Sequence, residues 1–491
     1  MSLLKKSAQE IAEAVRTRQL SVREVCEAFL AQAKKWNDSL GAFIWLNEKI
    51  VEQAQEMDQR ISAGHDPGPL AGVPVAIKDN ICTKDIPTTA ASKMLENFIS
   101  PFSATLVERL EASGALILGK TNLDEFAMGS SNENSAFGIC RNPWNLNRVP
   151  GGSSGGSAVA VAAGMSPLSI GTDTGGSIRQ PASYCGIVGV KPSYGRVSRY
   201  GLIAFASSLD QAGPMGRSVA DVALALEIMG GVDPWDATSA QVSVPKFCEN
   251  IDTNMKGLKL GLPREFFQTE LDGEIRTAIE RALALLKSAG AQLVENQMKT
   301  TELAVPTYYL IASSEASTNL SRYDGVRYGY RSDFSGNPAR DLEEFYSRSR
   351  GEGFGEEAKR RIILGTHALS TGHYDEFFNK ASRVRRLIRD EYIQAFQKCD
   401  LILGPVTSTL PFKIGEKIND PLSMYLNDVY TTSANLVGIP GMSLPVGLSK
   451  EGLPMGIQLL APHFEEQRLF NVGGFLESTL AEKERYPDVF R

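Results

Sequence analysis

The sequence predicts an α/β fold, in which one domain spanning residues 1–491 forms a β-sheet with helices on its faces. Short apolar segments typical of strands alternate with longer segments whose apolar residues recur every three or four positions, the periodicity of a helix. Such alternation indicates a sheet covered by helices. No internal repeat, charge block or low-complexity linker divides the chain, so we expect a single large domain.

The first part of the chain, about residues 1–65, is expected to form a helical layer that packs on the sheet. Two pairs of residues, Ser7 with Glu10 and Ser21 with Glu24, have the spacing of a capping box, which marks the start of a helix. Apolar residues three and four positions apart follow each pair. The region is therefore interpreted as helical throughout.

From Gly68 onward the chain alternates between short apolar segments and helices. The first such segment ends at Lys78, and the polar residues Asp79 and Asn80 follow it, which indicates a strand that ends at a site. The next elements are expected as helices at 105–113, 154–164, 219–229 and 272–289 and strands at 115–118, 166–171, 258–262 and 292–296.

A mostly helical insertion rich in Tyr, Arg and Glu is expected at about 307–397. The strand pattern then returns at 401–405 and continues as a hairpin of residues 442–446 and 455–460. A last helix is expected at 466–480. The second half of the chain thus adds helices and strands to the same predicted sheet.

Composition and charge exclude several classes of protein. Hydrophobic residues make up 42% of the chain and charged residues 22%, as in ordinary globular proteins, and the net charge is -6. An acidic chain is not expected to hold nucleic acid by itself. The six cysteines show no zinc or disulfide spacing, and the sequence predicts no signal peptide or membrane span, so we expect a cytoplasmic protein without bound metal.

Two clusters of glycine and serine, at 151–157 and 171–177, lie beside apolar segments in the middle of the chain. Glycine allows the backbone to approach another backbone or a ligand closely because it has no Cβ. A flexible linker is the alternative interpretation, but linkers stay polar, whereas Ala, Val and Ile are frequent here. The clusters therefore indicate a functional site.

Two motif matches in this part of the chain have the wrong context. Residues 114–121 match the phosphate-loop pattern, with Lys120 and Thr121 at its end, but their four central residues, Ala-Leu-Ile-Leu, favour a buried strand. Residues 151–155 match the nucleophile elbow around Ser153, but a loop rich in Pro and Asn precedes them where a strand is required. Nucleotide binding and an α/β-hydrolase remain as alternatives.

A third constellation combines Lys78 with Ser153 and Ser177. A serine hydroxyl needs a positioned base to act as a nucleophile. The chain has only four histidines and none lies in the glycine and serine clusters, so a lysine whose pKa is lowered by burial is a candidate base. Backbone N–H groups before Ser177 would suit a developing oxyanion. The alternative is that Lys78 is a surface strand end and both serines are turn residues.

These residues together resemble the amidase signature family, through Lys78 after an apolar strand, G-G-S-S-G-G-S at 151–157 and G-T-D-T-G-G-S-I-R-Q-P-A at 171–182. The resemblance covers about residues 70–480. It implies a mixed central β-sheet between helical layers and a Ser-Ser-Lys triad, with Ser177 as nucleophile, Ser153 as bridging serine and Lys78 as base. It also implies oxyanion-hole N–H groups from Thr174, Gly175, Gly176 and Ser177.

Further stretches resemble the branch of this family that supplies ammonia in tRNA-dependent amidotransferases, among them D-E-F-A-M-G-S-S at 124–131. This resemblance implies hydrolysis of glutamine, with partner subunits B and C completing a heterotrimer that holds Glu-tRNA(Gln), ATP and Mg. Arg361 and Asp428 would bind the carboxylate and amino group of glutamine, with Arg360 as the rival of Arg361, and a tyrosine from Tyr308-Tyr309 would lie nearby.

Three alternatives to this interpretation remain. One is a stand-alone amidase that acts on another small amide. The second is a nucleotide-binding protein that uses Lys120 and Thr121, and the third is a scaffold subunit without activity.

Overall fold

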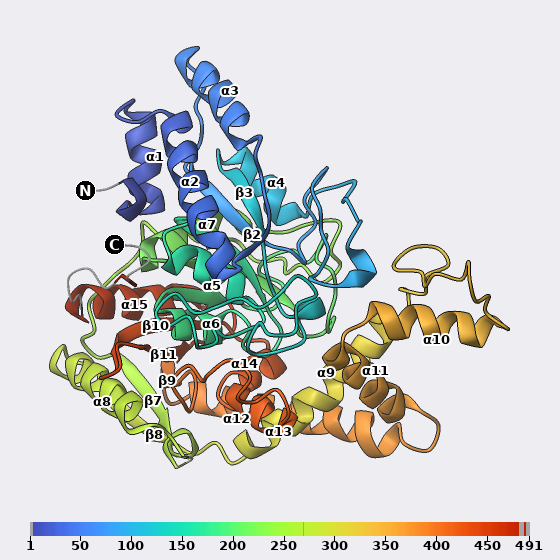
Figure 1. The fold of residues 1–491 in the computed structure, drawn as a ribbon. Coiled ribbons are helices and arrows are strands. Elements are labelled where there is room, and N and C mark those ends of the chain that lie inside the picture. The colour runs from blue at the N-terminus through green and yellow to red at the C-terminus, as the bar shows by residue number, and fades with distance from the viewer. Residues whose placement is uncertain (1–2, 269, 481–485, 488–491) are drawn as a thin grey trace.

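A computed structural model describes residues 3–268, 270–480 and 486–487, and one β-sheet runs through this part of the chain (Figure 1). The order of its strands across the sheet is β1-β3-β2-β4-β6-β5-β10-β11-β9-β7-β8. The strands are β1 Phe43–Leu46, β2 Pro74–Lys78, β3 Leu116–Thr121, β4 Leu168–Asp173, β5 Val188–Lys191, β6 Gln211–Gly216, β7 Lys259–Pro263, β8 Gln292–Asn296, β9 Leu401–Pro405, β10 Gly441–Leu448 and β11 Pro454–Leu460.

The sheet is mixed, as the resemblance implied. Strand β2 pairs in parallel with β3 and β4, and β7 pairs in parallel with β8 and β9. Between these two parallel groups, every neighbouring pair from β4 to β9 is antiparallel. Because β2 and β4 are parallel neighbours, their carboxyl ends, Lys78 and Asp173, lie at the same edge of the sheet.

Helices cover both faces of the sheet. The Cβ position of Gly441 in β10 points toward Arg179 of α6, whereas the side chain of the next residue, Met442, packs against Gly473 of α15. Successive strand residues point to opposite faces, so α6 and α15 lie on opposite sides of the sheet. The α-helices are α1 Ala8–Arg16, α2 Val22–Leu40, α3 Ile50–Ser62, α4 Thr105–Ala112, α5 Gly155–Ala162, α6 Arg179–Cys185, α7 Val219–Met229, α8 Gly273–Ser288, α9 Ala304–Leu320, α10 Leu342–Gly353, α11 Glu356–Leu369, α12 Lys380–Phe396, α13 Pro421–Tyr425, α14 Thr432–Val437 and α15 Glu466–Leu480.

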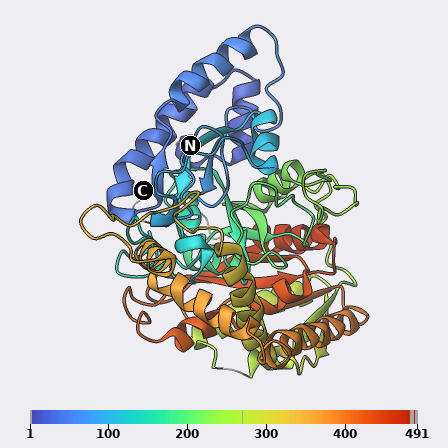
Figure 2. The same ribbon diagram turned by 90° about the vertical axis from the view of Figure 1, so that its right-hand side faces the viewer.

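Helices α1–α3 lie at one end of the molecule and α11 and α12 at the other, in both views (Figure 1, Figure 2). Both predicted capping boxes are present. The side chains of Ser7 and Ser21 accept the backbone N–H of Glu10 and Glu24, and the carboxylates of these two glutamates accept the backbone N–H of Ser7 and Ser21. The purely helical interpretation of residues 1–65 is wrong at β1, because this apolar segment pairs antiparallel with β3. A strand there extends the sheet and buries Phe43.

Helices α9 and α11 pack closely against each other. A Cβ on Gly365 of α11 would lie 1.9 Å from the Ser313 carbonyl oxygen of α9, so only glycine permits this approach. Helices α9, α10, α11 and α12 together make up most of the predicted helical insertion. Within the described ranges, no helix combines the length and apolar character needed to cross a lipid bilayer.

Candidate active site

Lys78 occupies the carboxyl end of β2, and its side chain is fully buried. Its Nζ lies 2.7 Å from Ser153 Oγ, 2.9 Å from Ser154 Oγ and 3.3 Å from the Thr172 carbonyl oxygen. Burial disfavours the ammonium form and lowers the pKa of Lys78 to about 7. The predicted base therefore contacts the predicted bridging serine and carries a pKa suited to proton exchange near neutrality.

The contacts of Lys78 also define its hydrogen-bonding state. Ser154 Oγ donates to the Thr172 carbonyl at 3.0 Å and accepts from the Thr172 N–H at 3.3 Å. A neutral amine has two N–H groups and one lone pair. When Lys78 donates its N–H groups to Ser154 and to the Thr172 carbonyl, its lone pair is left for the hydroxyl of Ser153.

The two glycines before Ser153 are required by close packing. A Cβ on Gly151 would lie 2.4 Å from Gln180 Oε1, and one on Gly152 would lie 2.1 Å from Asp124 Oδ2. The Gly152 N–H donates to Gln180 Oε1 at 2.9 Å, and the Gly152–Ser153 peptide is cis. The G-G-S-S motif thus reflects a backbone held between an amide and a carboxylate.

Ser177 lies in the loop between β4 and α6 and is 8% exposed. Its carbonyl oxygen accepts the N–H of Ser154 at 3.1 Å, which joins the two glycine and serine clusters directly. A Cβ on Gly175 would lie 2.7 Å from the Tyr308 hydroxyl oxygen, and one on Gly176 would lie 2.2 Å from Thr431 Oγ1. The loop of the predicted nucleophile is therefore packed against Tyr308 at Gly175 and against Thr431 at Gly176.

The predicted oxyanion donors differ in their availability. The Gly176 N–H already donates to Asp173 Oδ1 at 2.8 Å, so this predicted donor is engaged in the structure. The hydroxyl of Thr174 donates to Asp210 at 2.7 Å, which anchors the start of the loop. The N–H groups of Thr174, Gly175 and Ser177 stay the predicted oxyanion donors.

A buried ion pair supports this loop from behind. Arg179 donates from Nε and Nη2 to the two carboxylate oxygens of Asp173 at 3.0 and 3.1 Å, and both side chains are fully buried. Burial alone would raise the pKa of Asp173, but the charge and hydrogen bonds of Arg179 lower it to about 2. Asp173 is thus a permanent carboxylate that holds the Gly176 and Ile178 N–H groups.

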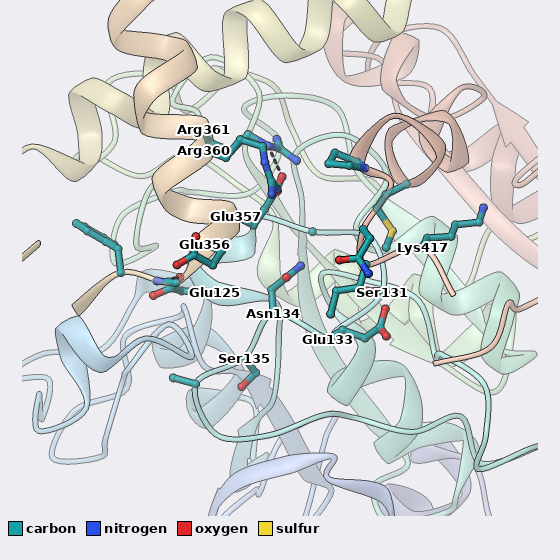
Figure 3. Close-up of a pocket in the computed structure, with 18 of the residues that line it drawn as sticks. Glu125, Ser131, Glu133, Asn134, Ser135, Glu356, Glu357, Arg360, Arg361 and Lys417 are labelled. Carbon is teal, nitrogen blue, oxygen red and sulfur yellow. Dashed lines mark hydrogen bonds and ion pairs between the residues drawn. The ribbon is translucent and has the colours of Figure 1, made fainter. Parts of the chain in front are cut away.

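A cavity of about 560 Å³ lies between α11 and the loop 129–136 (Figure 3). Figure 3 shows Arg360 and Arg361 on one helix, across the cavity from Ser131 and Asn134. Arg361 is buried and its guanidinium lies 4.4 Å from the ring centre of Tyr309, whereas the side chain of Arg360 is 46% exposed. Arg361 is therefore the stronger candidate for binding a carboxylate.

The Arg361 guanidinium is only partly satisfied. Its Nε donates to Glu357 Oε1 at 2.7 Å, but its Nη1 is buried and has no hydrogen-bond partner within the described part of the chain. A buried donor without a partner is costly. The position of Arg361 thus favours an anionic ligand group at Nη1.

Asp428 and the tyrosine pair complete the predicted site. Asp428 accepts the hydroxyl of Ser130 at 2.6 Å, and burial raises its pKa to about 7. Tyr308 touches the nucleophile loop at Gly175, whereas Tyr309 lies under Arg361. The structure thus places Tyr308 beside Gly175, in the loop of the predicted nucleophile Ser177, and Tyr309 beside the candidate carboxylate site.

The "Amidase" family model matches residues 24–470 of the chain. The chain belongs to the amidase family. It is 56% identical over 489 residues to the A subunit of the glutamyl-tRNA(Gln) amidotransferase of Bdellovibrio bacteriovorus, with 100% of both chains covered. It is 50% identical over 490 residues to the protein of the same name from a Sulfurihydrogenibium species, again with both chains fully covered.

Solved structures agree with this assignment. The A subunit of the glutamyl-tRNA(Gln) amidotransferase of Thermotoga maritima is 40% identical, with a TM-score of 0.83 and coverage of 100% of this chain and 99% of that one. The 6-aminohexanoate cyclic dimer hydrolase is 26% identical, with a TM-score of 0.85 and full coverage of both chains. The amidase fold thus accounts for the entire described sheet and its helices.

The structure of this amidase rules out both the phosphate-loop match at 114–121 and the nucleophile-elbow match at 151–155. Lys120 lies within β3, is fully buried, and donates to the carbonyls of Ile81 and Pro87 while it pairs with Asp79 at 3.2 Å. A lysine satisfied by these groups is not presented to a phosphate. Ser153 follows a loop and contacts Lys78, so the elbow interpretation also fails.

Sequence reasoning missed several side chains that hold this site. They do not belong to a predicted triad or substrate set. Two of them bond to backbone groups of the two clusters, one bonds to the backbone of the loop at Asn132, and three bond to the side chains of Lys78, Thr174 and Asp428. These residues are Asp124, Ser130, Ser154, Asp210, Thr431 and Gln180. The sequence signals were that Asp124 and Ser130 lie in the stretch 124–131, that Ser154 lies within G-G-S-S, and that Gln180 lies three residues after Ser177.

Proposed function

We propose that this amidase is a glutaminase subunit that releases ammonia from glutamine and supplies it to a partner subunit, which converts Glu-tRNA(Gln) to Gln-tRNA(Gln). The full-length similarity to A subunits of glutamyl-tRNA(Gln) amidotransferases supports the assembly. The observation that carries the chemistry is the buried Lys78 amine at 2.7 Å from Ser153 Oγ, beside the loop of Ser177.

The first half-reaction forms an acyl-enzyme. Ser177 Oγ attacks the side-chain amide carbon of glutamine and gives its proton to Ser153, whose own proton passes to neutral Lys78. The tetrahedral oxyanion is stabilised by N–H groups of the loop. As the C–N bond breaks, the proton returns through Ser153 to the amide nitrogen, and ammonia leaves.

The second half-reaction restores the enzyme. A water molecule attacks the Ser177 ester and gives a proton to the Ser153–Lys78 relay. Glutamate leaves when the C–Oγ bond breaks, and the relay returns the proton to Ser177. No histidine is required, because the pKa of Lys78 lies close to neutrality.

Recognition of glutamine would use two buried, oppositely charged groups. The unpartnered Nη1 of Arg361 suits the α-carboxylate, and Asp428 suits the α-ammonium. A cation at Asp428 would favour its carboxylate form and thus offset the burial that raises its pKa to about 7. Tyr308 would contact the substrate beside Gly175.

The remaining parts of the reaction are assigned to partners. We infer that subunits B and C complete a cytoplasmic heterotrimer, and that ATP and Mg bind the partner subunit. The net charge of -6 supports a tRNA held mainly by that partner. A stand-alone amidase for another small amide is the competing function, and the charged pair Arg361 and Asp428 favours a zwitterionic substrate over an apolar one.

The test is ammonia release from glutamine by the chain purified with its partner subunits, with and without ATP and Glu-tRNA(Gln). Ser177→Ala is expected to abolish release, whereas Ser169→Ala, which removes a buried serine from β4, is expected to retain it. Mass spectrometry of the trapped acyl-enzyme is expected to locate the adduct on Ser177. An adduct on Ser153, or no ammonia from glutamine, would overturn the proposal.

A further inference from the structure

Gln180 is fully buried in the first turn of α6, three residues after Ser177. Both ends of its side-chain amide are engaged. Its Oε1 accepts the N–H of Gly152 at 2.9 Å, and its Nε2 donates to the carbonyl of Ser130 at 3.1 Å. An amide is required at this position because one neighbour is a donor and the other an acceptor.

Each of these bonds leads to a different part of the site. Gly152 is joined by its peptide bond to Ser153, which contacts Lys78. Ser130 donates its hydroxyl to Asp428 at 2.6 Å. Buried hydrogen bonds, linked through the covalent frame of Ser130 and the Gly152–Ser153 peptide, thus connect the candidate ammonium-binding carboxylate through Gln180 to the candidate relay serine.

The series has little freedom to rearrange. The amide of Gln180 fills the space beside Gly151, where a Cβ would lie 2.4 Å from its Oε1. Its backbone N–H is held by the Gly176 carbonyl at 2.8 Å. A change at Asp428 that moves Ser130 would therefore act on Gly152 through a packed, fully buried amide.

We propose that Gln180 is a positioning residue that couples recognition of the substrate's α-ammonium group at Asp428 to the placement of Ser153. This inference rests on the proposed function. It implies that the α-amino group of glutamine contributes to kcat as well as to binding. That contribution depends on a glutamine at position 180.

The test compares glutamine with 4-carbamoylbutanoate, which has the same amide and carboxylate but no α-amino group. The complex with partner subunits is assayed as wild type, Gln180→Met and Gln180→Glu, because Glu keeps the acceptor but cannot donate to Ser130 when ionised. Gln180→Met is expected to lower kcat for glutamine at least tenfold with KM changed less than threefold. The ratio of kcat for the two substrates should fall toward one.

The matched control is Gln32→Met, which removes another buried glutamine whose amide donates to the Ala163 carbonyl at 3.0 Å, away from the site. It is expected to leave both kcat values and their ratio unchanged. A Gln180 variant that lowers kcat equally for both substrates, or changes KM alone, overturns the coupling.

A second measurement separates this inference from the proposed function. Phenylmethylsulfonyl fluoride sulfonylates activated serines, and its rate of reaction at Ser177 does not depend on glutamine being the substrate. Gln180→Met and Gln180→Glu are expected to slow this reaction because Ser153 is misplaced, but by a smaller factor than they slow the turnover of glutamine, because the reagent carries no α-ammonium group. An unchanged rate refutes the positioning role, whereas failure of the wild type to hydrolyse glutamine refutes only the proposed function.

Discussion

Replacing Lys78 with methionine tests whether burial lowers the pKa of this lysine. Methionine is similar in length and apolar, so it fills the buried space without a charge. Burial lowers the pKa of Lys78 from 10.5 to about 7, so between these values the unfolded chain binds more protons than the folded one. The stability of the wild type therefore rises with pH in this window, and that of Lys78→Met lacks this increment.

The expected size follows from the two pKa values. With a shift from 10.5 to about 7, keeping Lys78 neutral costs the folded state about 4 kcal/mol at pH 7 and about 2 kcal/mol at pH 9. The free energy of unfolding of the wild type should thus rise by about 2 kcal/mol relative to Lys78→Met between pH 7 and pH 9. The hydrogen bonds to Ser153 and Ser154 that the variant lacks lower its stability at both pH values, so they drop out of the change between pH 7 and pH 9.

The assay is equilibrium denaturation in urea at pH 7 and pH 9, with the surface variant Lys49→Met as control for the loss of one positive charge. Turnover of glutamine by Lys78→Met should fall by about 10²–10⁴-fold, the usual contribution of a general base. The wild-type rate should rise with pH through about 7 as Lys78 loses its proton. A stability difference that is identical at both pH values would refute the lowered pKa.

The other predictions concern recognition and packing. Arg361→Met should raise KM for glutamine by about 10–100-fold in steady-state kinetics, since a charged hydrogen bond is lost, whereas the exposed Arg360→Met should change it less than about threefold. A larger effect at Arg360 would reverse the assignment. Gly152→Ala should destabilise the chain by about 1–3 kcal/mol in urea denaturation, because its Cβ would meet Asp124 Oδ2 at 2.1 Å. Gly336→Ala, where a Cβ meets nothing within 4 Å, is the control, and equal effects would contradict the packing argument.

Much of the fold was predictable because periodicity is a local property. The helix at 219–229 and the strand at 292–296 have the predicted bounds, and the hairpin of β10 and β11 is present. Strand β6 was not predicted, because Gln211–Gly216 contains glycines and a proline and lacks the apolar run of a typical buried strand. Its burial depends on neighbours β4 and β5, which are distant in sequence.

The site was predictable only where a motif carries its chemistry. The contact of Lys78 with Ser153 joins residues 75 positions apart and was expected from the scarcity of histidine and from family resemblance. The loss of Gly176 as a free donor was not, because it depends on where the Asp173 carboxylate points. The proposed role of Gln180 likewise depends on how the start of α6 is placed against the loops of Ser130 and Gly152.

The close contact between α9 and α11 has a consequence for how such enzymes diversify. Gly365 packs against Ser313 and so joins the helix of Arg361 closely to the helix of Tyr308, whereas Lys78 ends strand β2 and Ser177 lies in the loop that follows β4. Exchanging residues on the helical unit would change which amide enters while the strand ends keep their geometry. A single reaction centre can in this way be inherited unchanged while its substrates diverge.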